Sequence, residues 1–216
     1  MPEIDIVFPC LNEASALPWV LRRVPSGARA IVVDNGSVDD SAAIAGRLGA
    51  LVVSCRQRGY GAACDAGLAA AGAEVVAFCD CDGTIDPVEV RRFAAALARE
   101  GGLVVGRRRP VTRSAFPAAA RLANAALARR VRIRTGQRLS DIGPIRVARR
   151  TDLLALRVAD RRFGYPVETV VRAADAGWSI TQLDVEYRPR IGRSKVTGTV
   201  RGYANAVKDV RRVLSA

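Results

Sequence analysis

The chain has 216 residues, half of them hydrophobic, which is enough for one sizeable buried core. It carries 34 Lys and Arg against 21 Asp and Glu, and the formal charge of +13 indicates anionic partners such as phosphates, nucleic acid or an acidic membrane surface. The absence of histidine excludes Ser-His-Asp triads, Cys-His dyads and histidine-based zinc sites.

The first hundred residues alternate short apolar runs, typical of buried strands, with segments of about ten residues typical of helices. Strands are expected at 4–8, 30–33, 51–54 and 75–79, and helices at 12–24, 39–48, 61–71 and 87–99. This alternation predicts βαβ units, and therefore an α/β fold with a mostly parallel central sheet and helices on both faces. Asp86 has the position of a helix N-cap, because Pro87 follows it at the first helical position.

The second half of the chain is less regular. Strands are expected at 103–105 and 179–187, and helices at 117–130, 147–156 and 166–176, with a last helix after the arginine-rich loop 188–195. A basic irregular stretch occupies 107–113, and a loop at 136–144 contains Asp141. Because no linker, repeat or low-complexity block separates the two halves, residues 1–216 are expected to form a single domain.

Three polar turns follow strands of the first half, at 9–13, 34–37 and 80–82. Ligands of parallel α/β sheets bind at the carboxyl ends of the strands, where these turns meet. Asp80 and Asp82 are two residues apart, so in an extended backbone their carboxylates point to the same side. Two close carboxylates repel unless a proton or cation lies between them, which makes Mg²⁺ or Mn²⁺ the natural partner. The alternative is a plain acidic turn before a helix.

Two glycines after the third strand allow two interpretations. Gly59 and Gly61 can serve only tight packing of a helix against the sheet. Read as a dinucleotide fingerprint, G-x-G-x-x-G, the same run has Cys64 in place of the last glycine and lies in the third βα unit. A Rossmann dehydrogenase is therefore disfavoured.

Other residues also have purely structural interpretations. Cys79 and Cys81 flank the carboxylates but point the other way, as packing thiols do. Glu168 and Arg172 are four residues apart on an expected helix and can form a plain surface ion pair. The basic run 107–109 is either a solvated loop or a set of phosphate contacts.

Seven motifs now stand in order along the chain. The first four are P-C-L-N-E at 9–13, V-D-N-G-S at 33–37, R-G-Y-G-A-A at 58–63 and D-C-D-G at 80–83. The others are D-I-G-P-I-R at 141–146, E-x-x-x-R-A at 168–173 and R-I-G-R-S-K-V-T-G-T at 190–199. Together they resemble the family 2 glycosyltransferases of the GT-A fold, and among these the dolichyl-phosphate mannose synthase group with its bacterial polyprenyl-phosphate relatives. The resemblance spans residue 4 to about residue 210.

The resemblance implies a role for each matching residue. The nucleotide pocket would be lined by Pro9, Leu11 and Glu13, and Asp34 would contact the base or its ribose. Asp80 and Asp82 would hold the metal and the sugar diphosphate. The remaining implied substrate-binding residues are Gly59, Arg190, Arg193, Ser194 and Lys195, the last four facing the phosphates.

Catalysis is expected to rest on Asp82, Asp141 and Arg190. A divalent ion and arginines neutralise the charge on a leaving diphosphate. A phosphate acceptor is already anionic and needs no general base, so Asp141 would position groups rather than accept a proton. The chain departs from the family pattern at Asn35, often Asp, and at Thr84, often Gln, which puts the sugar nucleotide and the metal affinity in question.

The expected function is a metal-dependent transfer of a hexose from a donor of the GDP-mannose or UDP-glucose type to a polyprenyl phosphate, and the resemblance implies inversion at the anomeric carbon. In this scheme residues 1–100 bind the nucleotide sugar and residues 101–216 form the acceptor side. The alternative is the same fold acting on a soluble small-molecule acceptor. A nucleotidyltransferase would carry a Gly-rich basic first loop, which the sequence lacks. No nucleic-acid-binding motif is present, so no nucleic-acid partner is expected.

The chain is expected to be cytoplasmic. No run approaches the ~18 apolar residues of a membrane span, the N-terminus lacks the pattern of a signal peptide, and five cysteines without framework spacing fit reduced thiols. The end of the chain predicts an amphipathic helix with an apolar stripe at Val200, Tyr203, Val207, Val210 and Leu214. This helix either packs on the core or lies peripherally on the anionic inner face of a membrane through Arg211 and Arg212.

Overall fold

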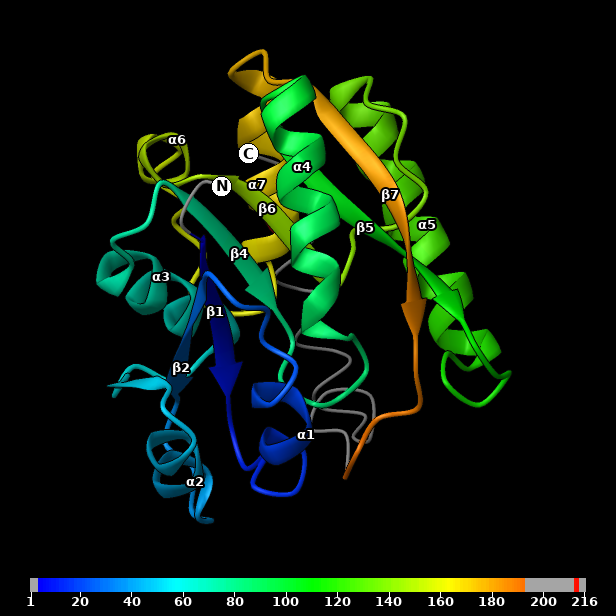
Figure 1. Ribbon diagram of the computed structural model, residues 1–216. Helices are drawn as coiled ribbons and strands as arrows, with labels where there is room; N and C mark the ends of the chain where they lie inside the picture. The colour runs from blue at the N-terminus through cyan, green and yellow to red at the C-terminus, as the bar shows by residue number, and fades with distance from the viewer. Residues whose placement is uncertain (1–3, 193–211, 214–216) are drawn as a thin grey trace.

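One seven-stranded sheet runs through the computed structural model, which describes residues 4–192 and 212–213 (Figure 1). The strands are β1 (Ile4–Cys10), β2 (Ala28–Asp34), β3 (Leu51–Ser54), β4 (Val75–Cys79), β5 (Leu103–Pro110), β6 (Ile145–Arg149) and β7 (Ile180–Tyr187). Their order across the sheet is β3-β2-β1-β4-β6-β5-β7. Every pair is parallel except the two that β6 makes with β4 and β5, so the expected mostly parallel sheet is confirmed.

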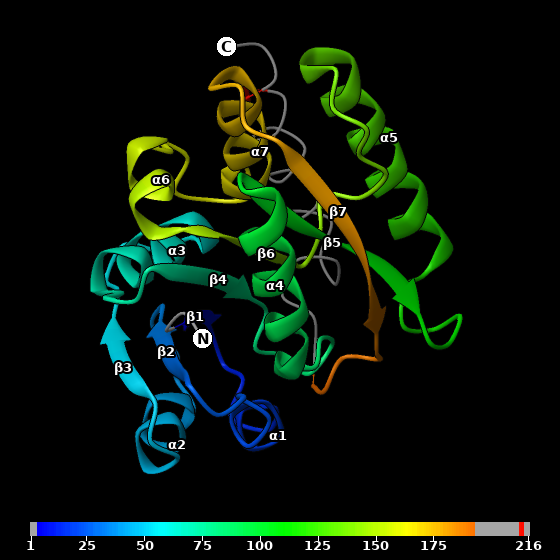
Figure 2. The ribbon, with the colours of Figure 1, turned by 45° about the horizontal axis from the view of Figure 1, so that its top comes forward.

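Helices cover both faces of the sheet, as predicted (Figure 2). One face packs against α1 (Leu17–Leu21), α2 (Ser41–Arg47) and α4 (Val90–Glu100), which follows the 3-10 turn η1 (Pro87–Glu89). The other face packs against α3 (Tyr60–Ala70), α5 (Ala118–Thr135), α6 (Arg150–Ala155) and α7 (Tyr165–Asp175). The two layers of apolar side chains, one on each side of the sheet, bury all of β4 and every residue of β1 except Pro9.

The antiparallel strand β6 was not expected from the sequence. A helix was predicted at 147–156, but residues 145–149 form β6 and only residues 150–155 form α6. Ile145 and Val147 pack into one core layer and Ala148 into the other, as alternation along a strand requires. Burial between two neighbouring strands overrides the local helical pattern, because both edges of β6 supply backbone partners.

Two further segments differ from expectation. The basic run after Gly106 is not irregular, because β5 continues to Pro110 along the parallel strand β7. There Asp184 of β7 forms ion pairs with Arg107 and Arg109. The predicted helix 12–24 is α-helical only at 17–21, since residues before it form a turn in which Asn12 has a φ of 53°.

Several smaller expectations are confirmed. The Asp86 side chain caps η1 by accepting a hydrogen bond of 3.1 Å from the amide of Val88. All five cysteines are buried and free of disulfides. Among the described residues, no helix has the length and hydropathy that crossing a membrane requires.

Candidate functional site

The polar turns after β1, β2 and β4 meet at one edge of the sheet, as the arrowheads in Figure 1 indicate. The amide of Asn35, just after β2, donates to the carbonyl of Cys10 at the end of β1 (2.8 Å). The amide of Glu13 donates to the hydroxyl of Ser41 at the start of α2 (2.8 Å). These bonds fix the first and second turns to each other. The thiol of Cys81 donates to the carbonyl of Pro9 (3.1 Å) and joins the third turn to the first, so the three turns form one rim.

Asp82 is a buried carboxylate of this rim that accepts three hydrogen bonds. Its Oδ1 accepts hydrogen bonds from the amide (3.0 Å) and hydroxyl (2.6 Å) of Thr84. Its Oδ2 accepts a bond of 2.7 Å from Nη1 of Arg190. The other terminal nitrogen of Arg190 donates to the carboxylate of Glu13. Three residues expected at the site, separated by up to 177 positions, are thus in direct contact.

The loop that carries Arg190 is attached to the rim through its backbone. The amide of Ile191 donates to the carbonyl of Asp82 and the amide of Arg188 to that of Thr84, both at 2.9 Å. Arg193, Ser194 and Lys195, which were expected to face the phosphates, lie outside the described residues. Their roles therefore stay predictions.

Asp80 lies half-buried beside Asp82. Burial, together with the negative charge of Asp82, raises the pKa of Asp80 to about 6. Its Oδ1 accepts a hydrogen bond of 3.3 Å from the hydroxyl of Tyr60, at the start of α3. The two carboxylates therefore converge as the D-x-D spacing indicates, and they repel each other.

Behind Asp80 lies a fully buried arginine that the sequence did not identify as part of the site. Nη2 of Arg146 donates to the hydroxyl of Tyr60 (3.0 Å) and Nη1 to the carbonyl of Gly143 (3.1 Å). Its guanidinium lies 5.7 Å from the ring centroid of Phe78 on β4. Arg146 thus orients Tyr60, which in turn holds Asp80. Arg146 belongs to the motif at 141–146, in which only Asp141 was assigned a role from the sequence, and recognising β6 as a strand was needed to see what Arg146 contacts.

Asp141 is buried in the loop before β6 and forms mainly structural contacts. Its Oδ2 accepts a bond of 2.9 Å from the amide of Arg108, and its Oδ1 one of 2.8 Å from the amide of Gly143. The guanidinium of Arg108 lies 3.6 Å from the same carboxylate and stacks over the rings of Phe116 and Tyr187. These contacts fit the expected positioning role, with Arg108 as the group positioned, and a catalytic role of Asp141 stays a prediction.

The turn after β2 is braced by Asn35, whose side chain is buried. Its Nδ2 donates to the carbonyls of Cys55 (3.1 Å) and Gln57 (2.7 Å), and its Oδ1 accepts from the amide of Gly59 (2.8 Å). An ionised aspartate could not donate the first two bonds. Asn35, the residue by which the chain departs from the family pattern here, therefore stabilises the turn after β2.

Three expected nucleotide contacts lie at the same edge. The Oδ1 of Asp34 accepts from the amide of Ser37 (3.0 Å), while Pro9 and Leu11 are half-buried at the end of β1. Arg58, which the sequence did not single out, donates to the carbonyls of Asn35 and Gly36 from across this turn. Contact of any of these residues with a nucleotide stays a prediction.

Gly59 and Gly61 pack against the backbone of a loop that comes from the second half of the chain. A Cβ on Gly59 would lie 2.1 Å from the carbonyl oxygen of Arg161, and one on Gly61 would lie 2.4 Å from that of Asp160. Gly59 also has a φ of 142°, which L side chains rarely adopt. Packing alone accounts for both glycines, and the substrate-binding role of Gly59 stays a prediction.

Glu168 holds the loop that these glycines contact, so the interpretation as a plain surface ion pair is wrong. Its carboxylate is buried and accepts hydrogen bonds from the amides of Ala159 (2.9 Å) and Asp160 (2.6 Å) as well as from Arg172 (2.6 Å).

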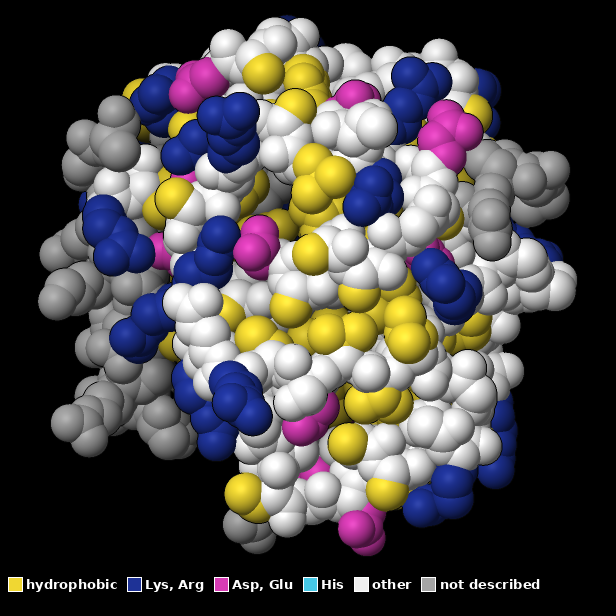
Figure 3. Space-filling model, turned by 90° about the vertical axis from the view of Figure 1, so that its left-hand side faces the viewer, with side chains coloured by type: hydrophobic (Ala, Val, Ile, Leu, Met, Phe, Trp, Pro, Cys, Tyr) yellow, Lys and Arg dark blue, Asp and Glu magenta, His cyan; other side chains and the backbone are white. Residues whose placement is uncertain are grey.

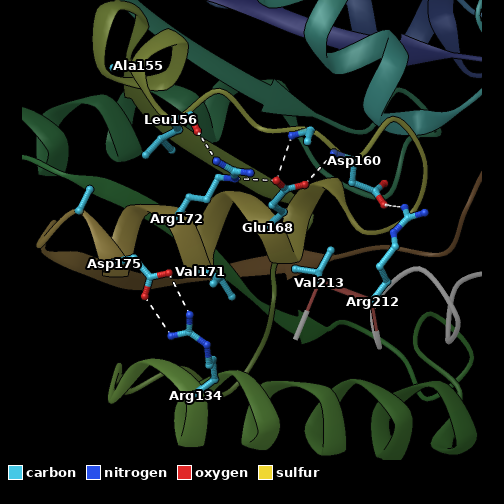
Figure 4. A pocket seen from close by; sticks show the side chains of 12 residues that line it. Arg134, Ala155, Leu156, Asp160, Glu168, Val171, Arg172, Asp175, Arg212 and Val213 are labelled. Atoms are coloured by element: carbon cyan, nitrogen blue, oxygen red, sulfur yellow. Dashed lines mark hydrogen bonds and ion pairs between the residues drawn. The ribbon is translucent and has the colours of Figure 1, made fainter. Parts of the chain in front are cut away.

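A hollow of about 730 Å³ lies away from the rim, between α5, α6 and α7 (Figure 4). Its charged side chains are joined in pairs: Arg134 with Asp175, Arg172 with Glu168, and Arg212 with Asp160. Each of these carboxylates therefore faces an arginine, and the residues expected at the site do not line this hollow. Arg212, one of the two arginines expected to face a membrane, instead contacts Asp160 at 2.6 Å.

The donor set at the rim fits a hard divalent cation. Asp80 and Asp82 supply carboxylate oxygens, and their mutual repulsion is what a cation would relieve. Within the described part of the chain, no group of three or more acidic or cysteine side chains gathers as a complete ligand set. A cation held here would take its other ligands from a bound diphosphate or from water.

Comparisons with known proteins identify the family. The pattern described as Glycosyl transferase family 2 matches residues 5–156. A Mycobacterium tuberculosis H37Rv protein named uncharacterized glycosyltransferase Rv0539 is 47% identical over 213 residues, covering 98% of each chain. A dolichyl-phosphate hexose transferase of Haloferax volcanii is 28% identical over 197 residues, covering 90% of this chain and 86% of that protein.

Solved structures show the same fold. Glucosyl-3-phosphoglycerate synthase of M. tuberculosis, in complex with Mn²⁺, UDP and glucosyl-3-phosphoglycerate, has a TM-score of 0.76 and 23% identity, over 99% of this chain and 80% of that one. The same enzyme with Mg²⁺ and UDP has a TM-score of 0.76 and 24% identity, over 99% and 78%. The GT-A fold expected from the sequence is thus confirmed, and with the family pattern and the 47% identical relative, the chain belongs to glycosyl transferase family 2.

Proposed function

We propose that this glycosyltransferase moves a hexose from a nucleoside diphosphate sugar to a phosphate-bearing acceptor with the help of Mg²⁺ or Mn²⁺. The observation that carries this proposal is the convergence of Asp82, Glu13 and Arg190 at the carboxyl end of β4, beside Asp80. Carboxylates for a cation and an arginine for phosphate oxygens are what the departure of a diphosphate requires.

The residues of the rim have separate tasks in this proposal. Asp80 and Asp82 would hold the cation, which when bound neutralises part of the charge on the diphosphate. Arg190 would exchange its bonds to Asp82 and Glu13 for bonds to the phosphates. Tyr60 keeps the carboxylate of Asp80 oriented through its hydroxyl.

The acceptor has two candidates. A small soluble phosphorylated molecule is supported by the solved relatives of the same fold, one of which is bound to glucosyl-3-phosphoglycerate. The polyprenyl phosphate expected from the sequence is the second candidate. It is favoured by the relative named dolichyl-phosphate hexose transferase, at 28% identity. Donors with UDP come first for testing, because UDP is the nucleotide in the solved complexes.

The first test is a thermal shift of the purified protein against UDP- and GDP-sugars, with and without Mn²⁺. A ligand that binds only the folded protein raises its melting temperature. Transfer of a labelled sugar to phosphorylated small acids and to a short-chain polyprenyl phosphate then separates the two acceptors. Absence of a shift with every sugar nucleotide, in the presence of Mn²⁺, would overturn the proposal.

The first prediction concerns the cation. Asp82→Asn is expected to abolish transfer and the Mn²⁺-dependent part of the nucleotide shift while leaving the fold intact, because an amide keeps the oxygen that accepts from Thr84 but loses the charge. Circular dichroism checks the fold. Full activity of this variant, or of the wild type in excess EDTA, would contradict a role for the metal.

A further inference from the structure

A continuous stretch of the chain carries most of its excess charge. Residues 101–140 contain no Asp or Glu, and they contain ten arginines, at positions 107, 108, 109, 113, 121, 129, 130, 132, 134 and 138. Half of these arginines lie on α5, which is at the outer edge of the molecule in both views (Figures 1 and 2). Figure 3 shows the side away from α5, where acidic and basic side chains occur together.

Helix α5 has a stripe of mostly apolar side chains on its outward side, interrupted by Arg129, as well as apolar side chains on its buried side. It is anchored to the core by Ala128 and Val131, the two buried residues of its 18. Leu122 and Ile133 are nevertheless 72% and 68% exposed. Leu122, Ala126 and Ile133 are separated by four and seven residues, so they share one line along the helix. That line faces away from Ala128 and Val131.

Arginines lie along both flanks of this outward stripe. Arg121 and Arg132, eleven residues apart, lie on one flank, and Arg130 lies on the other, while Arg129 lies on the stripe itself. Of the five arginines on α5, only Arg134 has an ion pair among the described residues, with Asp175. A second apolar face bordered by cations is the pattern of helices that lie in the interface of an anionic bilayer.

We infer that α5 docks this protein on an anionic membrane surface, with Leu122 and Ile133 entering the interface and the flanking arginines contacting lipid phosphates. A second copy of the chain fits this face poorly, because both surfaces would be cationic. Nucleic acid fits the arginines but leaves the apolar stripe uncovered. This inference rests on the surface alone and goes beyond the proposed function.

The docking surface adjoins the candidate site. Phe116, in the loop before α5, packs against Tyr187 with ring centroids 5.6 Å apart and lies under the guanidinium of Arg108. Arg108 in turn contacts Asp141. A bilayer that receives α5 would therefore lie next to the end of β5, on the side where an acceptor could approach from the membrane.

The test is co-sedimentation of the full chain with vesicles of phosphatidylcholine and phosphatidylglycerol, and with vesicles of phosphatidylcholine alone, at low and high salt. Binding is expected only to the anionic vesicles and is expected to weaken at high salt. Replacing Leu122 and Ile133 together by Glu should lower the partition coefficient at least tenfold. Replacing Arg121 and Arg132 by Glu should lower it by roughly thirtyfold or more, at about a fivefold change per charge lost near the surface.

Control variants carry the same kinds of substitution at exposed positions outside α5. Val38 is 90% exposed and Leu154 is 42% exposed, and their double replacement by Glu is expected to leave vesicle binding unchanged. Arg22, just after α1, and Arg47, at the end of α2, are exposed and serve the same purpose for the charge reversal. All variants should keep the thermal shift with sugar nucleotide, so that loss of docking and failure of the proposed function remain distinguishable.

Four outcomes would overturn the inference. They are absence of binding to anionic vesicles at low salt, equal loss of binding in the α5 and control variants, salt-sensitive binding to double-stranded DNA without vesicle binding, and a dimer that becomes monomeric when Leu122 and Ile133 are replaced. The last two would assign the face to nucleic acid or to a second copy.

Discussion

Arg190 satisfies two carboxylates at once in this structure, and its own task in the proposed reaction requires it to leave them. Both oxygens of Asp82 already accept hydrogen bonds, one set from Thr84 and one from Arg190. A cation that binds Asp82 must therefore compete with the guanidinium for Oδ2. The arginine and the metal are alternatives at Asp82 until a diphosphate gives the arginine another partner.

The second prediction follows from that competition. Arg190→Ala is expected to bind nucleoside diphosphate about tenfold or more weakly, since a charge-assisted hydrogen bond contributes about 1.5–3 kcal/mol. The same variant should bind Mn²⁺ more tightly than the wild type when nucleotide is absent. Calorimetric titrations with each ligand measure both effects. Arg188→Ala, two residues away, is the control, and a fall in both affinities for Arg190→Ala would contradict the competition.

The third prediction uses the raised pKa of Asp80, about 6 in the folded protein against 3.8 for the ordinary carboxyl. Between these values the folded protein binds more protons than the unfolded chain. The free energy of unfolding therefore falls as the pH rises from about 4 to about 6, and it stays lowered above that. Asn cannot ionise, so the Asp80→Asn variant does not lose this free energy of unfolding. In metal-free buffer at pH 8 the variant should therefore melt at a higher temperature than the wild type. The difference should shrink toward pH 4, and a constant difference would refute this account.

Residue patterns predicted the carboxylates of the rim but not their supports. Asp80 and Asp82 were found because a two-residue spacing at the end of a buried strand is a local property. Asn35 and Glu168 also belong to the motifs, but their side chains bond to backbone groups of loops elsewhere in the chain. The nearest partner is 20 residues away for Asn35 and 8 residues away for Glu168. Such partners depend on tertiary contacts that a single sequence does not display.

At the scale of elements, β6 carries the buried arginine that supports the site. It lies antiparallel between β4 and β5, with Phe78 of β4 directly opposite Arg146. This register places the Arg146 guanidinium behind Tyr60 and Asp80. The parallel strands were predicted from regular alternation of strand and helix. β6 was missed because its five residues run straight into α6 without a turn signal between them.

The fourth prediction tests the support that β6 provides. Tyr60→Phe removes a single hydroxyl and leaves Nη2 of the buried Arg146 without that partner. The free energy of unfolding should fall by about 1–3 kcal/mol, and affinity for Mn²⁺ should also fall, because Asp80 loses its orienting bond. Tyr165→Phe, in a tyrosine packed edge-on to Phe78, is the matched control and should leave Mn²⁺ affinity unchanged. Urea unfolding measures the free energy of unfolding, and titration measures the affinity for Mn²⁺. Equal effects of the two substitutions would contradict the role of the Tyr60 hydroxyl in orienting Asp80.

For the whole molecule, the formal charge of +13 is unevenly distributed along the chain. Residues 101–140 contribute ten positive charges and no negative ones, while the rest of the chain is nearly balanced. The total charge indicated anionic partners from the sequence, but not the place where they bind. The surface that we propose for one such partner could be recognised only from the fold, which leaves Leu122 and Ile133 of α5 exposed between arginines.

The position of β6 has a consequence for how the chain reaches its fold. β4 is apolar along its whole length, and its two neighbours in the sheet are β1, which is made before it, and β6, which begins at residue 145. A nascent chain that has released only the first hundred residues would therefore present β4 as an open, hydrophobic edge strand. Such edges pair readily with other chains. We expect the first half expressed alone to aggregate, because it lacks the strand that covers this edge of β4.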